Sequence, residues 1–395
     1  MFGHMEYRFA DCVLDEAGRS LTRAGSRAAV EPQVFDLILL LVRNPARVVT
    51  RDEIVDVVWQ GRIVSESAIS ARISAARKAV GDDGKQQAVI RTVARHGLQM
   101  ATEVTQAAPQ ATATADPPTQ RIRYTRNARG HSIAFAVTGS GPPVVRMGYN
   151  HTHLEEEWTA QVDRPFFDRM SAENTLIRFD PAGVGLSEPA PVEIDFDAMA
   201  EDILTVATAA GQERFAILSH SGGALAAVRA AALAPDRVTH LVVMAGYVDG
   251  RVRRQTSPEP DAIRAMFAEG WGSPDAAFST AYMMSYFPEG PLDAVQDFVR
   301  ITAASCPRDQ ALRIRDASNA DSLADYLPKV QCPTLVIHSR HDGVHPLSEA
   351  RKLAAGIPNA ELVVMETANL IPLPGQPEWP RMMQTVLDFL KTGQA

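Results

Sequence analysis

Residues 215–223 read Phe215-Ala216-Ile217-Leu218-Ser219-His220-Ser221-Gly222-Gly223, and they decide the fold of the larger part of this chain. The first four residues are typical of a short buried strand, the next five of a tight turn, and the Ala-rich residues that follow, up to 232, of a helix. Further strand-like runs alternate with helical stretches, at residues 144–145, 176–179, 241–244, 335–337 and 362–364. This alternation predicts an α/β domain with a mostly parallel sheet and helices on both faces.

Two loops of this domain resemble motifs of the α/β-hydrolase-fold family. The turn at residues 219–223 resembles the nucleophile elbow G-x-S-x-G, with Ser219 in place of the first glycine. Upstream, residues 180–187 (Asp-Pro-Ala-Gly-Val-Gly-Leu-Ser) resemble the family's D-x-x-G-x-G-x-S loop. The resemblance implies that Ser221 lies at a strained apex and that the Gly222 N–H is an oxyanion donor. Residues 147–150 (Met-Gly-Tyr-Asn) take the place of the family's oxyanion segment, which makes the Tyr149 N–H a second donor.

The catalytic triad that the resemblance implies is incomplete. Asp342, in the segment His338-Ser339-Arg340-His341-Asp342, takes the place of the acid, but no histidine follows His345. By alignment of residues 366–370, Leu370 falls where the family's histidine would be. Without an imidazole, Ser221 is a weak nucleophile, so the sequence predicts that the domain is not an enzyme. If the domain is active after all, Ser221 and Asp342 are the catalytic candidates, and the base would have to be one of four other histidines: His151, His153, His220 or His341.

An inserted helical cap is expected at about residues 247–330, because this stretch lacks a clear strand pattern and is rich in aromatic residues and methionines. Together with the former catalytic site, the cap is expected to form a pocket for a small organic effector. The residues predicted to line that pocket are Ser221, Gly222, His220, Tyr149, Asn150, Asp342, Leu370, Tyr282 and Met283.

The N-terminal residues, 1–104, predict a second domain of mixed α and β structure. Short alternating segments around Tyr7, Phe9, Val13 and Leu21 predict a small antiparallel sheet. Three helices follow: one over residues 34–42, one from Thr50 with a Thr50/Glu53 capping box, and one over residues 65–80. Residues 90–93 and 98–100 then predict a hairpin with a basic tip.

This order of elements resembles the OmpR/PhoB-type winged-helix family, over residues 6–104. The most similar segments are residues 31–37, 49–53, 75–81 and 90–93. The resemblance implies that the third helix enters the major groove of double-stranded DNA and that the hairpin, or wing, reaches the minor groove. The residues predicted to contact DNA are Ser67, Ser70, Arg72, Ser74, Arg77, Lys78, Arg91, Thr92, Arg95 and His96.

Charge and composition separate the two domains. Residues 1–104 hold 14 Lys and Arg against 13 Asp and Glu, whereas the remainder holds 25 against 34, so an overall net charge of -8 conceals a slightly basic first part. Residues 105–120 contain only Ala, Thr, Pro, Gln and one Asp, and they predict a flexible linker that spans on the order of 20 Å. The hydrolase-like domain is expected at 121–395.

The leading hypothesis from the sequence is a cytoplasmic transcriptional regulator whose incomplete hydrolase domain senses an ester, a lactone or a similar effector. Two alternatives remain open: an active serine esterase fused to a DNA-binding domain, and a hydrolase fold that serves only as a dimerisation scaffold. A homodimer is expected because one small DNA-binding module reads few base pairs. No apolar run is long enough for a membrane span. The three cysteines, Cys12, Cys306 and Cys332, lack metal-site spacing, and neither a metal nor a cofactor is expected.

Overall fold

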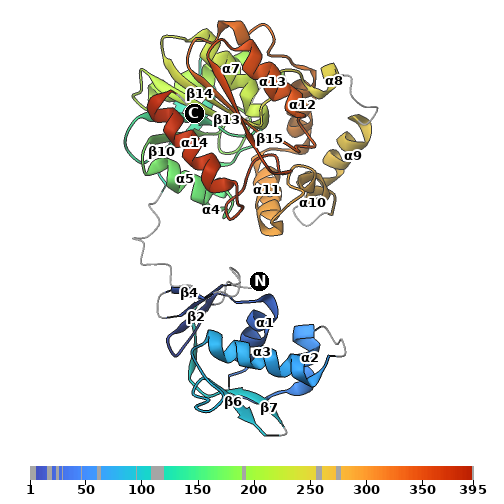
Figure 1. Ribbon diagram of the computed structural model, residues 1–395. Coiled ribbons are helices and arrows are strands. Elements are labelled where there is room, and N and C mark those ends of the chain that lie inside the picture. The colour runs from blue at the N-terminus through green and yellow to red at the C-terminus, as the bar shows by residue number, and fades with distance from the viewer. Residues whose placement is uncertain are drawn as a thin grey trace. The chain divides into compact units, whose positions relative to one another are not determined.

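The computed structural model describes residues 6–15, 20–23, 26–28, 30–45, 47–59, 64–94, 96–107, 120–188, 193–254, 260–272 and 277–393. The chain divides into two compact units, Met1–Pro118 and Thr119–Ala395. Both are drawn in Figure 1.

The first unit begins with a five-stranded antiparallel sheet. Its strands are β1 (Glu6–Phe9), β2 (Cys12–Asp15), β3 (Ser20–Arg23), β4 (Ser26–Ala28) and β8 (Val104–Ala107), in the order β4-β3-β2-β1-β8. The predicted domain boundary at residue 104 is therefore too early. Because β8 pairs with β1 from Phe9↔Val104 to Glu6↔Ala107, residues 105–107 of the predicted linker belong to the sheet. Residues 108–119 of that linker lie outside the described part.

The helices and the hairpin of the first unit confirm the winged-helix prediction. The helices are α1 (Pro32–Arg43), α2 (Arg51–Trp59) and α3 (Glu66–Ala79); a small sheet joins β5 (Val49–Thr50), β7 (Gly97–Met100) and β6 (Ile90–Val93). The predicted capping box is present at α2: the Thr50 N–H donates to Glu53 Oε2 (2.7 Å), and the Glu53 N–H donates to Thr50 Oγ1 (3.3 Å). Both exchanges satisfy donors that the first turn of a helix leaves free.

An eight-stranded sheet forms the centre of the second unit, in the order β16-β15-β14-β13-β11-β12-β10-β9. The strands are β9 (Ile122–Arg126), β10 (Ser132–Thr138), β11 (Pro143–Met147), β12 (Thr175–Phe179), β13 (Phe215–His220), β14 (Val238–Met244), β15 (Thr334–Ser339) and β16 (Ala360–Met365). All six strands predicted from apolar runs are confirmed, and they pair in parallel. The antiparallel strands β9 and β10 at the edge were not predicted.

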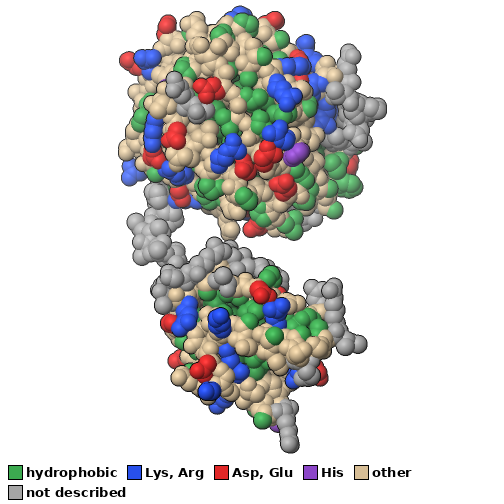
Figure 2. Space-filling model, in the orientation of Figure 1, with side chains coloured by type: hydrophobic (Ala, Val, Ile, Leu, Met, Phe, Trp, Pro, Cys, Tyr) green, Lys and Arg blue, Asp and Glu red, His purple; other side chains and the backbone are tan. Residues whose placement is uncertain are grey.

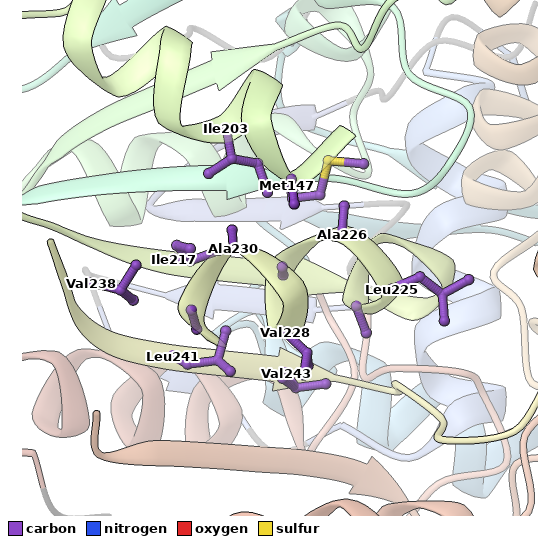
Figure 3. Packing of buried hydrophobic residues seen from close by; sticks show 14 of the residues in the cluster. Met147, Ile203, Ile217, Leu225, Ala226, Val228, Ala230, Val238, Leu241 and Val243 are labelled. Atoms are coloured by element: carbon purple, nitrogen blue, oxygen red, sulfur yellow. The ribbon is translucent and has the colours of Figure 1, made fainter. Parts of the chain in front are cut away.

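Helices cover both faces of this sheet, and successive strand residues point to opposite faces. On one face, Ile217 and Val243 are buried with α6 (Phe196–Ala209), α7 (Ala224–Leu233) and α13 (Leu347–Gly356). On the other, Leu218 and Val242 are buried with α5 (Arg164–Ser171) and α14 (Trp379–Thr392). Figure 3 shows α7 lying on the strands through small residues such as Ala226 and Ala230, which bring the helix close to the sheet.

The predicted cap is helical. Between β14 and β15 lie α8 (Arg251–Arg254), α9 (Pro260–Gly270), α10 (Ala277–Met284), α11 (Leu292–Ser305) and α12 (Arg308–Ala320), all visible in Figure 1. The short helix α4 (Leu154–Thr159) is not part of this segment; it comes earlier in the chain, after β11. Among the described helices, none combines the length and the apolar composition that crossing a membrane requires.

Candidate functional site

Helix α3 presents a row of small and basic side chains in the first unit. Ser67, Ser70, Ser74 and Lys78 are exposed along it, as the sequence predicted. The Ser65 side chain caps the helix by accepting a hydrogen bond from the Ala68 N–H (3.3 Å). Figure 2 shows basic side chains interspersed with uncharged ones on the visible face of this unit.

Two of the predicted DNA-contacting arginines are engaged within the protein. Arg77 donates through Nε and Nη2 to the carbonyl oxygen of Ile90 (3.1 and 3.0 Å) and through Nη2 to Thr92 Oγ1 (2.8 Å), so it ties the helix to the wing. Arg72 donates to Gln33 Oε1 (3.0 Å) and pairs with Glu31 Oε2 (2.6 Å). Both side chains therefore position α3, in addition to any contact with DNA.

The wing carries the other predicted contacts. Arg91, Thr92 and His96 are exposed, on or beside β6 and β7. His96 Nδ1 lies 2.9 Å from the carbonyl oxygen of Ala94, which holds the ring against the tip of the hairpin. Arg95 lies outside the described residues.

The elbow of the second unit has the strained geometry that its sequence predicts. Ser221 follows β13 with a φ of 47°, in the left-handed region, and it begins the short 3-10 turn η1 (Ser221–Gly223) that leads into α7. A Cβ atom at Gly223 would lie 2.0 Å from the carbonyl oxygen of Gly148, so only glycine fits there. Ser219, which replaces the usual glycine, is fully buried and donates to the carbonyl oxygen of Val242 (3.3 Å).

A histidine does lie against Ser221, and the expectation that no imidazole reaches this serine is wrong. Ser221 Oγ is 3.1 Å from His345 Nε2. His345 comes from the loop after β15, on the acid side of the family's site, and not from the loop after β16. Its ring stacks on Tyr247, with centroids 4.4 Å apart and planes at 27°. Burial lowers the pKa of His345 well below its usual range, and the charge of Arg254 lowers it further, so the ring is neutral at pH 7.

Asp342 organises the loop and does not contact the His345 ring. Its Oδ1 accepts hydrogen bonds from the N–H groups of Val344 (2.7 Å) and His345 (3.0 Å). His338 Nε2 donates to the carbonyl oxygen of His345 (2.8 Å) and lies 3.6 Å from Asp342 Oδ2. His345 Nδ1 is buried without a hydrogen-bond partner among the described residues. Among the described residues, the contacts therefore join Ser221 to the His345 ring and Asp342 to the main chain of the His345 loop.

A cavity of about 230 Å³ opens beside this pair, and we name it the Ser221 cavity. Seven of the nine residues predicted for the effector pocket line it: Ser221, Gly222, Tyr149, Asn150, Leu370, Tyr282 and Met283. Leu370 is 1% exposed, and its backbone is held by Tyr286 and Ser339. The remaining lining includes His345 with its neighbours Gly343 and Val344, and the cap residues Phe267, Trp271, Tyr286, Phe298 and Arg315.

Two of the predicted pocket residues do not line the cavity. His220 lies on the other side of the elbow, where its ring packs against Tyr149 (5.3 Å) and Phe166 (5.4 Å), because adjacent residues on the turn point apart. Asp342 faces the main chain of its own loop. Of the histidines weighed as a replacement base, only His151 lines the cavity, where its ring packs on Trp271 at 4.6 Å.

Sequence reasoning does not point to His345, because the resemblance implies a base after the last strand, β16, whereas His345 follows β15. The sequence carries no local signal for the contact, because the position of Asp342 three residues before His345 accounts for the turn of the loop and not for the direction of the His345 ring. The described residues contain no cluster of His, Cys, Asp and Glu suited to hold a metal ion.

Comparisons with known proteins match both units. A family model described as "alpha/beta hydrolase fold" matches residues 157–371, and one described as "Transcriptional regulatory protein, C terminal" matches residues 25–100. The pimeloyl-[acyl-carrier protein] methyl ester esterase of Aliivibrio salmonicida is 28% identical over 214 residues, which are 53% of this chain and 80% of that protein. The transcriptional activator CadC of Escherichia coli is 28% identical over 94 residues, which are 24% of this chain and 18% of that protein.

Solved structures agree on the fold of the second unit. A thermophilic esterase from Thermogutta terrifontis matches with a TM-score of 0.56 at 21% identity, over 70% of this chain and all of that one. An esterase from Exiguobacterium antarcticum matches with the same TM-score and identity, over 68% of this chain and 99% of that one. At this level of identity the match concerns the fold alone.

For the DNA interface, we expect Lys78→Ala to weaken binding to duplex DNA and to reduce the slope of log K against log salt by about 1, without changing the unfolding temperature. Arg77→Ala is expected to weaken binding by roughly 1 to 3 kcal/mol and also to lower the unfolding temperature, because its bonds to the wing are lost. Fluorescence anisotropy across a salt series and thermal unfolding measure these effects, with Arg340→Ala in the second unit as the control. DNA binding that does not respond to salt would contradict the interface.

For the serine–histidine pair, we expect a fluorophosphonate probe to label Ser221 at a rate that stays nearly constant from pH 8 down to pH 6. The pKa of His345 is lowered, so its neutral form, which accepts the serine proton, persists below the usual titration range of histidine. His345→Gln is expected to slow labelling by about 100-fold or more, and the exposed His341→Gln is the control. Mass spectrometry measures the adduct. A rate that falls through pH 6.5, or that is unaffected in His345→Gln, would remove His345 from this role.

Proposed function

Because the chain belongs to the α/β hydrolase fold family and joins that fold to a transcriptional regulatory domain, we propose that it regulates transcription in response to a small organic molecule bound in the Ser221 cavity. The observation that carries the proposal is the cavity itself, which lies at the hydrolase nucleophile in a chain that also carries a DNA-binding domain. Aromatic and other apolar side chains line most of it, and a few polar groups converge beside Ser221, as in small-molecule sites.

Sensing requires that the effector bind one DNA-binding arrangement of the protein more tightly than another, since only differential affinity shifts an equilibrium. A dimer is part of the proposal, because paired winged-helix modules read two half-sites and a change in their pairing changes DNA affinity. The open cavity argues against the scaffold alternative, in which side chains would fill the former active site.

Slow ester hydrolysis is a second candidate function, and the contact between Ser221 and His345 favours it. A neutral imidazole within 3.1 Å of the serine oxygen can take its proton. Against turnover, His345 Nδ1 has no carboxylate to stabilise the imidazolium that forms when the proton arrives, and the charge of Arg254 opposes that form. Because His345 must carry a proton in acylation and again in deacylation, this arrangement slows both steps, and we expect any turnover to be slow.

We expect a thermal-shift screen of small esters, lactones, amides and carboxylates to find compounds that stabilise the second unit. A ligand at 100 times its dissociation constant adds about 2.7 kcal/mol to the free energy of unfolding. The same compounds should change the affinity for DNA. Thr302→Phe is the matched variant, because Thr302 lines the cavity and its hydroxyl bonds only within its own helix, so a larger side chain fills space at small cost.

The outcomes of this screen distinguish the sensing proposal from the esterase alternative. Stabilisation that disappears in Thr302→Phe assigns binding to the cavity. If no compound stabilises the protein and its affinity for DNA never changes, the sensing proposal fails. Turnover of p-nitrophenyl butyrate that vanishes in Ser221→Ala, with no effect of the ester on DNA binding, would instead favour the esterase.

A further inference from the structure

The Ser221 cavity is lined by three arginines, Arg251, Arg254 and Arg315, and by no aspartate or glutamate among the described residues. Arg251 and Arg254 lie on helix α8, and Arg315 lies on helix α12. All three arginines are partly buried, so each guanidinium has lost part of its hydration, and an anion in the cavity would offset that loss.

Arg254 has N–H groups without a hydrogen-bond acceptor among the described residues. Its Nη2 donates to the carbonyl oxygen of Val344 (3.3 Å), which fixes the guanidinium beside the His345 loop. Its Nε and Nη1 are buried and have no hydrogen-bond partner among the described residues. Its Cζ lies 5.9 Å from the ring centroid of Tyr247, the residue that stacks on His345. Two donors of a planar guanidinium are thus held near the serine–histidine pair without an acceptor.

Arg315 reaches the cavity from helix α12, together with Ser318 and Asn319. The three residues share one face of α12, at positions i, i+3 and i+4. Ser318 Oγ accepts from Asn150 Nδ2 (2.9 Å), and Asn150 in turn lies against Gly222 of the elbow. The Arg315 side chain is 10% exposed, and its Cζ lies 5.7 Å from the ring centroid of Phe267. A polar wall therefore runs from the elbow to this second guanidinium.

Three nearby carboxylates, Asp342, Glu349 and Asp316, lie outside the lining of the cavity and are hydrogen-bonded to other groups. The charges of Glu349 and Asp342 offset part of the lowering of the Arg254 pKa that burial causes. Glu349 pairs with Lys352 (2.8 Å) and accepts the N–H of Val248 (3.0 Å). Asp316 accepts hydrogen bonds from Nε and Nη2 of Arg264. Its Oδ1 lies 3.9 Å from Arg315 Nη1, which is too far for a hydrogen bond. None of the three carboxylates lines the cavity, so none satisfies its charge from within.

We propose that the effector of this regulator is an organic carboxylate, whose anionic group pairs with Arg254 and whose apolar body lies against the aromatic cap residues Phe267 and Trp271. The inference rests on the proposed function and names the chemical class of its ligand. A guanidinium forms strong charge-assisted hydrogen bonds with a carboxylate, and Nε and Nη1 of Arg254 are each free to donate one. Trp271 Nε1 already donates to the carbonyl oxygen of Cys306 (2.7 Å), so its ring is fixed as an apolar wall.

The test compares matched pairs of a carboxylate and its neutral amide: phenylacetate with phenylacetamide, and hexanoate with hexanamide. Isothermal calorimetry on the full chain is expected to show each acid binding at least tenfold more tightly than its amide. Arg254→Gln and Arg315→Gln are expected to weaken binding of the acids by about tenfold to a hundredfold, the range for a charge-assisted hydrogen bond, and to leave the amides unchanged. Arg253→Gln is the control, because Arg253 lies on the same helix, is exposed and does not line the cavity.

Three results would overturn the inference. Equal affinity for acids and amides, unchanged in Arg254→Gln, would show a neutral ligand site and would leave the proposed function standing. Binding of inorganic phosphate or chloride as tight as that of the acids would show an anion site with no selectivity for an organic body. If none of the four compounds binds while the ester and lactone screen finds ligands, the carboxylate assignment alone fails; if that screen is also empty, both proposals fail. Thermal unfolding of each variant separates loss of binding from loss of folding.

Discussion

At Ser221 the backbone leaves strand β13 and turns toward helix α7 with a φ of 47°. Gly223 lies so close to the carbonyl oxygen of Gly148 that no side chain fits at this position. This turn aims the serine oxygen away from the sheet, while the next residue back, His220, points into the core between Tyr149 and Phe166. The α7 helix beyond it is rich in alanine, so it can lie close enough to the sheet to hold the strain. The position of the cavity follows from that one constrained turn.

The proposed carboxylate ligand and a catalytic triad make opposite demands on the charges around His345. A triad needs an imidazolium to form beside the serine, and it stabilises that cation with a carboxylate on Nδ1. Here Asp342 accepts hydrogen bonds from the main-chain N–H groups of Val344 and His345. The positive charge of Arg254 disfavours a protonated His345. An anionic ligand next to Arg254 would add to the partial compensation that Glu349 and Asp342 give its charge, and it would reduce the repulsion between Arg254 and a protonated His345. The positive charge of Arg254, which opposes an imidazolium at His345, is thus the charge that would pair with the proposed carboxylate.

The sequence predicted the parts of this structure that depend on local pattern, and it missed those that depend on contacts between distant segments. Apolar runs predicted the six parallel strands, and the Thr50/Glu53 spacing predicted a capping box whose two hydrogen bonds are present. The partner of Ser221 was missed because His345 reaches it across 124 positions of sequence. The sequence of α3 does not distinguish a basic residue that faces solvent from one that bonds to the wing. The hydrogen bonds from Arg77 to Ile90 are therefore known only from the structure.

The net charge of the second domain runs against the charge of its cavity. Residues 105–395 carry 34 Asp and Glu against 25 Lys and Arg, yet the Ser221 cavity is lined by arginines and no acid among the described residues. At physiological ionic strength, exposed charges are screened within about 8 Å, so the acidic surface repels an anion only weakly at longer range. Within the cavity that screening is much weaker, and the guanidinium groups act at short range in a low dielectric. The anion selectivity that we propose would therefore come from the cap helices α8 and α12, which supply the arginines, and not from the domain's overall charge.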